Sequence, residues 1–236
     1  MMTSATPNWG GEILKNNLMN NIVLLTLISL LFLSCNSCDT ITSPRCERDF
    51  AFSIPVSLSP ALDTFSIGDT IAIELEFPIQ MIDEITSDTI DMTTYPFATT
   101  INFARLDTIL ASSANTLVEF VVTQGELEFI PLFGGINITH ITYETINSNF
   151  VFSCKVVLKS KGLFEFGSGS IKPYHDIYQE IQPSCKTKSV EMKYELLPSG
   201  GDDNFDFLAF SPDPQKKNYP NDKFIANSGF VFFVTD

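Results

Sequence analysis

The sequence predicts a mainly β protein, namely an antiparallel β-sandwich with a small α+β C-terminal extension packed on it. Apolar and polar residues alternate over many short segments, which is typical of strands with one buried face. Turn signals rich in Gly, Pro, Asn and Asp separate these segments. The 236 residues include 21 Phe and 6 Tyr, and aromatic residues fit a pleated, half-buried surface. With 44% hydrophobic and 18% charged residues, the composition argues against disorder.

An apolar run near the start of the chain ends at a cysteine. Ile22–Leu33 is long enough for the core of a signal peptide and too short to span a bilayer as a helix. Phe32-Leu33-Ser34-Cys35 resembles the lipobox of bacterial lipoproteins, which implies cleavage after Ser34 and lipid on Cys35. We therefore expect a signal peptide over residues 1–34 and a lipidated tether over 35–49. The alternatives are cleavage before Cys38 and an ordinary secretory signal.

The first predicted strands of the sandwich follow the tether. Phe50–Leu58 places five apolar side chains on one face, and Pro55 within it predicts an edge strand because proline cannot donate to a neighbour. Ile71–Phe77 alternates apolar residues with Ala and Glu, which predicts one face in the core and one in water. Asp83–Pro96 is polar and is predicted to be a long loop, with a short helical turn at Gln80–Ile85.

The remaining predicted strands complete a sandwich over residues 50–166. They comprise two single strands, in which apolar and polar residues alternate, and two predicted hairpins with glycine in the turn. The segments are Thr99–Leu106, Ile136–Ile146, the hairpin of Leu117–Thr123 with Glu126–Ile130, and the hairpin of Phe150–Lys159 with Leu163–Phe166.

One short motif carries a family resemblance. Asp63–Ile73, with the sequence DTFSIGDTIAI, resembles the opening of bacterial immunoglobulin-like (Ig-like) domains of cell-surface proteins. With the lipobox, the whole pattern resembles uncharacterised lipoproteins of Bacteroidetes. The resemblance implies an Ig-like β-sandwich and an envelope location, and it brings no known activity and no functional residue.

The pattern changes in residues 167–236, the predicted C-terminal extension. Tyr174–Ile181 predicts a short helix and Ser189–Leu196 predicts a strand. Asp203 or Asn204 is a predicted helix cap for the residues up to Ala209. Phe230–Val234 is too apolar to remain exposed, so we expect it to complete a sheet of the sandwich.

Charge is distributed unevenly along the chain. Asp49–Cys154 contains 14 acidic residues and a single basic one, Arg105, whereas 155–236 contains 11 acidic residues and 10 lysines. The acidic first half argues against binding of nucleic acid or anionic lipid, and the lysines are scattered and form no phosphate-binding stripe.

Four cysteines remain if Cys35 carries lipid, an even number in an oxidising compartment. We predict a disulfide between Cys154 and Cys185 that fastens the extension to the sandwich. The competing pattern joins Cys46 to one of these two and leaves Cys38 free.

No cofactor and no metal are predicted. Asp202, Asp203, Asn204 and Asp206 form the densest group of oxygen ligands and are weak candidates for Ca²⁺. Their spacing does not match an EF-hand loop, and a helix cap explains them equally well. The chain has no Gly-x-Ser-x-Gly, His-Glu-x-x-His or Gly-x-x-x-x-Gly-Lys motif, so we do not expect an enzyme.

Together these patterns predict a lipid-anchored envelope protein that binds a protein or a glycan without catalysis and does not bind nucleic acid. Asn36 after the lipidated cysteine favours the outer membrane, on either its periplasmic or its surface face. The alternative is a structural or accessory subunit of an outer-membrane complex. An exposed aromatic patch would favour the binding module, whereas a flat uncovered face beside the last strand would favour the subunit.

Overall fold

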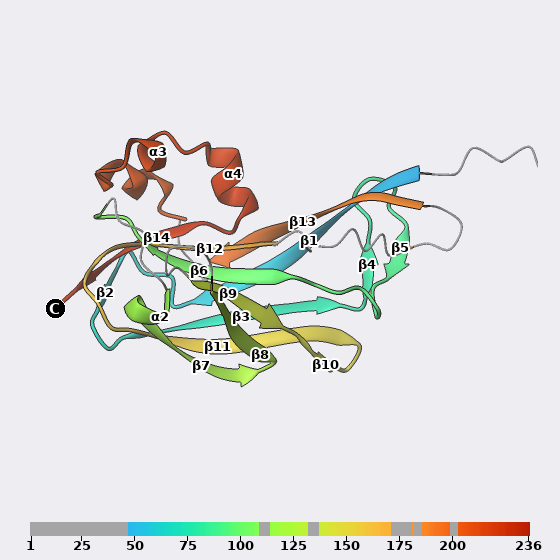
Figure 1. Ribbon diagram of the computed structural model, residues 1–236, viewed down its shortest axis with the longest axis horizontal. Coiled ribbons are helices and arrows are strands. Elements are labelled where there is room, and N and C mark those ends of the chain that lie inside the picture. Colours follow the sequence, from blue (N-terminus) through green and yellow to red (C-terminus); the bar gives the residue numbers. More distant parts are fainter. Residues whose placement is uncertain (1–46, 109–113, 132–136, 171–180, 182–185, 199–202) are drawn as a thin grey trace, which may run out of the picture. The chain divides into compact units, whose positions relative to one another are not determined.

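Two six-stranded sheets pack face to face in the computed structural model, which describes residues 47–108, 114–131, 137–170, 181, 186–198 and 203–236 (Figure 1). The predicted signal peptide and the tether up to Cys46 lie outside these residues. The first strand begins at Glu47, so the last three residues of the predicted tether belong to the fold.

Sheet A has the order β10-β11-β3-β1-β13, and β7 also pairs with β11. Because β3 occupies one edge of β11, β7 and β10 share its other edge. The strands of sheet A are β1 (Glu47–Ser59), β3 (Thr70–Pro78), β7 (Val118–Gln124), β10 (Glu144–Ile146), β11 (Asn149–Leu158) and β13 (Lys186–Pro198).

Sheet B has the order β2-β14-β12-β6-β9-β8. Its strands are β2 (Thr64–Ser66), β6 (Thr99–Arg105), β8 (Glu126–Pro131), β9 (Asn137–Thr142), β12 (Gly162–Ser170) and β14 (Phe230–Thr235). A short helix, α2 (Ala114–Leu117), leads directly into β7.

The predicted alternation places the core between the sheets, which confirms a sandwich. Phe50, Phe52, Ile54, Val56 and Leu58 of β1 are all at most 1% exposed, and they belong to one apolar cluster with residues of β3, β11, β12 and β14. Phenylalanine is the most frequent residue in this cluster. The fold is therefore mainly β, as predicted.

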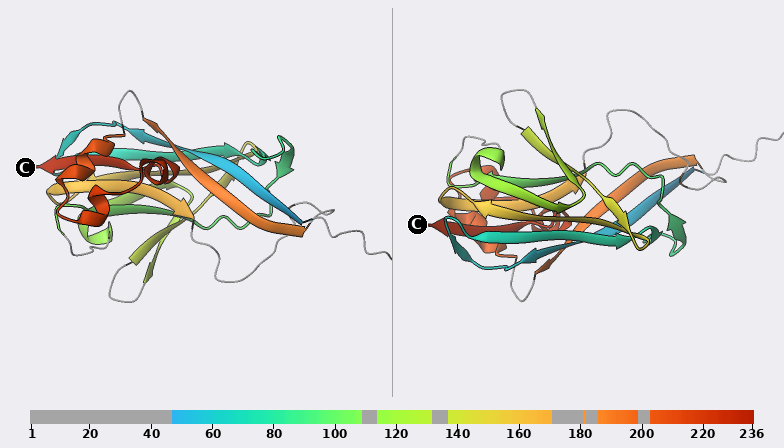
Figure 2. Two further views of the ribbon diagram at one scale, coloured as in Figure 1. Left: turned by 90° about the horizontal axis from the view of Figure 1, so that it is seen from above. Right: turned by 90° about the horizontal axis from the view of Figure 1, so that it is seen from below.

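The sandwich is not antiparallel throughout, because two strand pairs are parallel. β1 and β13 pair in parallel from Glu47↔Lys186 to Leu58↔Pro198, and Figure 2 shows them side by side. β2 pairs in parallel with β14. β1 is an inner strand, but β3 pairs only with its last three residues, Ser57–Ser59. The edge predicted from Pro55 therefore exists locally, where β3 does not reach β1.

Both predicted hairpins are wrong, because each pair of strands is divided between the two sheets. β7 pairs in sheet A and β8 in sheet B, and β11 and β12 are divided in the same way. Gly125 joins β7 to β8 with φ 76°, and a Cβ there would lie 2.4 Å from the Thr142 carbonyl oxygen. The glycine thus permits a corner between sheets.

The segment predicted as a loop with a helical turn contains the hairpin of β4 (Gln80–Ile82) and β5 (Thr89–Asp91). Asp83 is wholly buried and fixes this hairpin to β1. Its carboxylate accepts hydrogen bonds from Ala51 N at 3.0 Å, Thr86 Oγ1 at 2.7 Å and Arg48 Nη2 at 2.8 Å. Burial acts to raise the pKa of Asp83, but these hydrogen bonds outweigh it and lower the pKa to about 2.

The predicted extension supplies strands to both sheets. β12 continues to Ser170, so it crosses the predicted domain boundary after residue 166. β13 lies in sheet A and β14 lies inside sheet B. The position of β14 confirms the prediction that the last strand completes a sheet.

Between β13 and β14, three short helices form the helical cap, residues 203–229, which packs on the outer face of sheet B (Figure 1). They are the 3-10 helix η2 (Phe205–Phe210), α3 (Pro214–Lys217) and α4 (Asn221–Ala226). A second apolar core lies beneath the cap and consists of Leu106, Leu163, Leu208, Phe224 and Val231.

Candidate functional site

A cavity of about 460 Å³ opens beside the helical cap, between η2 and the ends of β12 and β14. Apolar side chains line it, and charged residues surround it. We call it the aromatic groove; its lining residues are Arg105, Asp107, Lys161, Gly162, Leu163, Phe210, Phe233, Val234, Thr235 and Asp236.

Two phenylalanine rings, Phe210 and Phe233, line the groove, and a third ring, Phe207, packs against Phe233. Phe207 and Phe210 are three residues apart in η2, the spacing at which side chains of a 3-10 helix lie on one side. Both rings contact Phe233 of β14, with centroids 5.3 Å and 5.8 Å from its own. Phe210 is 65% exposed, which is unusual for a residue of this size. Phe207 and Phe233 are half-buried, so Phe210 is the exposed ring of this three-ring cluster.

Two ion pairs stand at the rim of the groove. Arg105 pairs with Asp107 at 2.5 Å and Lys161 with Asp236 at 3.0 Å. Gly162 lies between them, and a Cβ there would lie 2.7 Å from Asp107 Oδ2. Exposed ion pairs contribute little to stability, so their main effect here is to surround the rings with charges of both signs.

The predicted lipidation site, Cys35, lies outside the described residues. Within them, no helix combines the length and the apolar character that a membrane crossing requires.

The predicted disulfide receives no support from the described residues. Cys154 is a free thiol, wholly buried between the sheets, and burial raises its pKa to about 12. Cys185 lies outside the described residues. The next residue, Lys186, pairs with Glu47 at the start of β1. Cys154 pairs with Ile73 of β3, and Ile73 in turn pairs with Leu58 near the end of β1.

The weak Ca²⁺ candidates have structural roles where they are described. Asp203 Oδ1 accepts from Phe205 N at 3.0 Å at the start of η2, and the exposed Asp206 follows. The Asn204 amide donates to the Val231 carbonyl oxygen at 2.9 Å. Asp202 lies outside the described residues, and among those described no group of three or more His, Cys, Asp or Glu side chains is placed to hold a metal ion.

The sequence reasoning missed the aromatic groove, although one signal for it was present. Phe230–Val234 is apolar at every position, which is typical of a strand covered on both faces. Phe232 faces the inter-sheet core, so Phe233 faces the other way, toward the cap.

Comparison with known proteins adds distant structural likenesses only. No protein-family model and no curated protein matches the chain.

Among solved structures, a type II cohesin domain from the cellulosome of Acetivibrio cellulolyticus shares 10% identity over 52% of this chain and 77% of its own, with a TM-score of 0.26. A non-cellulosomal cohesin from Archaeoglobus fulgidus shares 10% identity over 65% of this chain and 94% of its own. The seventh ScaB type I cohesin from Pseudobacteroides cellulosolvens shares 9% identity over 64% of this chain and 96% of its own. The last two have TM-scores of 0.24, and scores at this level carry no argument about fold or function.

Proposed function

We propose that this chain is a lipid-anchored protein of the bacterial envelope that binds a protein partner in the aromatic groove and catalyses no reaction. The observation that carries the proposal is the 65% exposed Phe210 ring beside a cavity of about 460 Å³. Protein interfaces concentrate their binding energy in aromatic and apolar anchors at the centre and place polar groups at the rim. The partner inserts an apolar side chain between Phe210 and Leu163, with polar residues on either side of it.

The alternative, an accessory subunit that docks through a flat face beside the last strand, has weaker support. β14 carries the helical cap on its outer face, since Val231 packs with Leu208 and Phe224, and Phe233 packs with Phe207. The uncovered face that would favour this alternative is thus occupied by the chain itself.

The lipid anchor rests on the lipobox resemblance of Phe32–Cys35 and on the apolar run before it. We propose that the chain is cleaved after Ser34 and acylated on Cys35, and that Asn36 directs it to the outer membrane. Cys35→Ala should leave the protein unprocessed or release it from the membrane fraction. Mass spectrometry that finds an unlipidated N-terminus beyond Cys38 would refute this part of the proposal.

The binding role is tested by capture of partners from the native envelope with the full lipidated chain. Phe210→Ser removes the exposed anchor, and Leu197→Ser is its matched control, because Leu197 of β13 is also exposed, at 53%, and lies outside the groove. We expect a partner that is recovered with the wild type and the control and lost with Phe210→Ser. Recovery of the same proteins with all three chains would contradict the proposal.

A further inference from the structure

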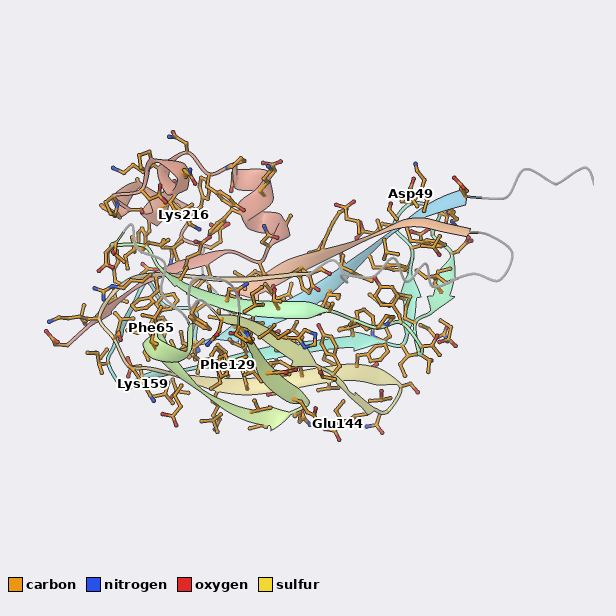
Figure 3. The ribbon with its side chains drawn as sticks, in the orientation of Figure 1. Asp49, Phe65, Phe129, Glu144, Lys159 and Lys216 are labelled. Carbon is orange, nitrogen blue, oxygen red and sulfur yellow. The ribbon has the colours of Figure 1, made fainter. Side chains whose placement is uncertain are left out.

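A second cavity, of about 310 Å³, lies on the other flank of the helical cap, and we call it the polar cleft. Its floor is the outer face of β6 and β12, where Asn102 pairs with Gly167 and Ala104 with Glu165. Its walls come from α3, from α4 and from the residues that follow each helix. Figure 3 labels Lys216 on the side of the cap that faces sheet B.

Two glycines in the interior of β12 leave part of the floor of the cleft without side chains. Gly167 and Gly169 face outward in register with Asn102 and Thr100, and neither has a positive φ. A Cβ at Gly169 would lie 3.8 Å from Thr100 Oγ1 and 3.9 Å from Asn227 Oδ1, which is ordinary van der Waals contact. Glycine weakens a strand, and in a strand interior it often marks a close approach of a ligand or another backbone.

The two positions differ in what approaches them. At Gly167, a Cβ would lie 3.4 Å from the Asn227 carbonyl oxygen, so the backbone of the cap explains a small residue there. No comparable backbone contact exists at Gly169. Only side-chain atoms of Thr100 and Asn227 come within 4 Å of that position, so neither conformation nor a close backbone contact requires glycine there, and a ligand would account for it.

The walls present hydrogen-bonding groups and one aromatic ring. Lys216 pairs with Glu165, and its ammonium lies 5.5 Å from the centroid of the half-buried Tyr219 ring. The Asn227 amide donates to the Tyr219 hydroxyl oxygen at 3.4 Å. The Asn102 amide is exposed on the floor, and no hydrogen bond within the described part of the chain engages it.

This set of groups matches a neutral ligand with many hydroxyls. Amides, a phenol, a carboxylate and an ammonium together both donate and accept hydrogen bonds. The charges of Lys216 and Glu165 cancel, and the carboxylate opposes binding of phosphate or other anions. The lining of the cleft is about equally polar and apolar, which suits a ligand that has both kinds of surface, and its volume is at the lower end of the range for small-molecule sites.

We infer that the polar cleft binds a neutral saccharide, with one sugar ring lying over Gly169 and its hydroxyls bonded to Asn102, Asn227 and Tyr219. This site is separate from the aromatic groove. It would let the anchored chain hold a glycan and a protein partner at the same time.

The test is saturation-transfer NMR and titration calorimetry on the full chain. The probes are glucose, galactose, mannose and N-acetylglucosamine, with glucuronate and inorganic phosphate as charged probes. We expect at least one neutral sugar to bind. Gly169→Val, which fills the floor with a residue that strands favour, should lower its affinity at least tenfold and leave the thermal midpoint unchanged.

Ala72→Val is the matched control, because it adds the same kind of side chain to an outward position of β3 in sheet A, away from the cleft. It should bind sugar like the wild type. Asn102→Ala supplies an independent loss of binding, because it removes a hydrogen-bonding amide from the floor instead of filling the floor. The inference is overturned if no neutral sugar binds, if only glucuronate or phosphate binds, or if Gly169→Val binds sugar as the control does.

Discussion

The inter-sheet core and the helical cap are built on different scales. The inter-sheet core draws on nearly every strand, and its largest side chains, among them Phe52, Phe152 and Phe166, are completely buried. The core beneath the cap contains only Leu106, Leu163, Leu208, Phe224 and Val231. Both cavities lie beside the cap. Stability therefore resides in the sandwich, and both proposed binding sites lie beside the smaller of the two apolar cores.

The largest expected effect is in the inter-sheet core. Phe152→Asp would bury an unpaired charge in β11 and should destabilise the fold by more than about 4 kcal/mol, enough to unfold it. Lys155→Asp is the control, because Lys155 is an exposed residue of the same strand. Circular dichroism and thermal melting distinguish them. A folded Phe152→Asp protein would mean that this face of β11 is not the core face.

A smaller, local effect is expected beneath the cap. Phe224→Ala removes the ring that contacts Phe205 at 5.2 Å, and a substitution of this kind costs about 3 kcal/mol. Hydrogen exchange should quicken in Phe205–Ala226 and stay slow in β3 and β11. If exchange quickens equally in both regions, cap and sandwich form one cooperative unit and the contrast between them is wrong.

The buried Asp83 carboxylate helps to hold the β4–β5 hairpin to the sandwich, beside the buried apolar side chains of Met81 and Ile90, and acid should reveal its contribution. The pKa of Asp83 is about 2 in the folded protein and near 4 when unfolded, so its contribution is present above pH 4 and is lost as the pH falls toward 2. Asp83→Asn should flatten the dependence of unfolding free energy on pH between 4 and 2. An unchanged slope would show that the carboxylate is not ionised within this network.

The smallest effect concerns the thiol of Cys154, which should be inert in the folded protein. Burial raises its pKa to about 12, so almost no reactive thiolate exists at neutral pH. Iodoacetamide should label Cys154 only after unfolding. Non-reducing peptide mapping that finds Cys154 in a disulfide with Cys185 or Cys46 would contradict this prediction.

The face of each strand could be predicted from the sequence, because period-two alternation directly records which side chains are buried. Ile73 lies on the predicted core face of Ile71–Phe77, and it is 0% exposed. The pairing of the strands could not be predicted, because a glycine that follows polar residues is equally compatible with a hairpin turn and with a corner between the two sheets. At Gly125, the distinction depends on Thr142, a residue of another strand.

Other contacts join still more distant parts of the chain. β1 and β13 are paired across a separation of 139 residues, as in Glu47↔Lys186, and no local pattern indicates such a partner. The aromatic groove joins η2, β12 and β14, which come together only in the folded chain. Its one local sign was the unbroken apolar run Phe230–Val234.

The central claim, that the chain binds a protein partner through the aromatic groove, is tested most directly by photo-crosslinking in the native envelope. The photoreactive amino acid p-benzoylphenylalanine replaces Phe210 in one chain and Leu197 in another, both exposed positions. We predict one discrete crosslinked protein from position 210 and none from position 197. Equal crosslinking from the two positions, or none from position 210, would contradict the account.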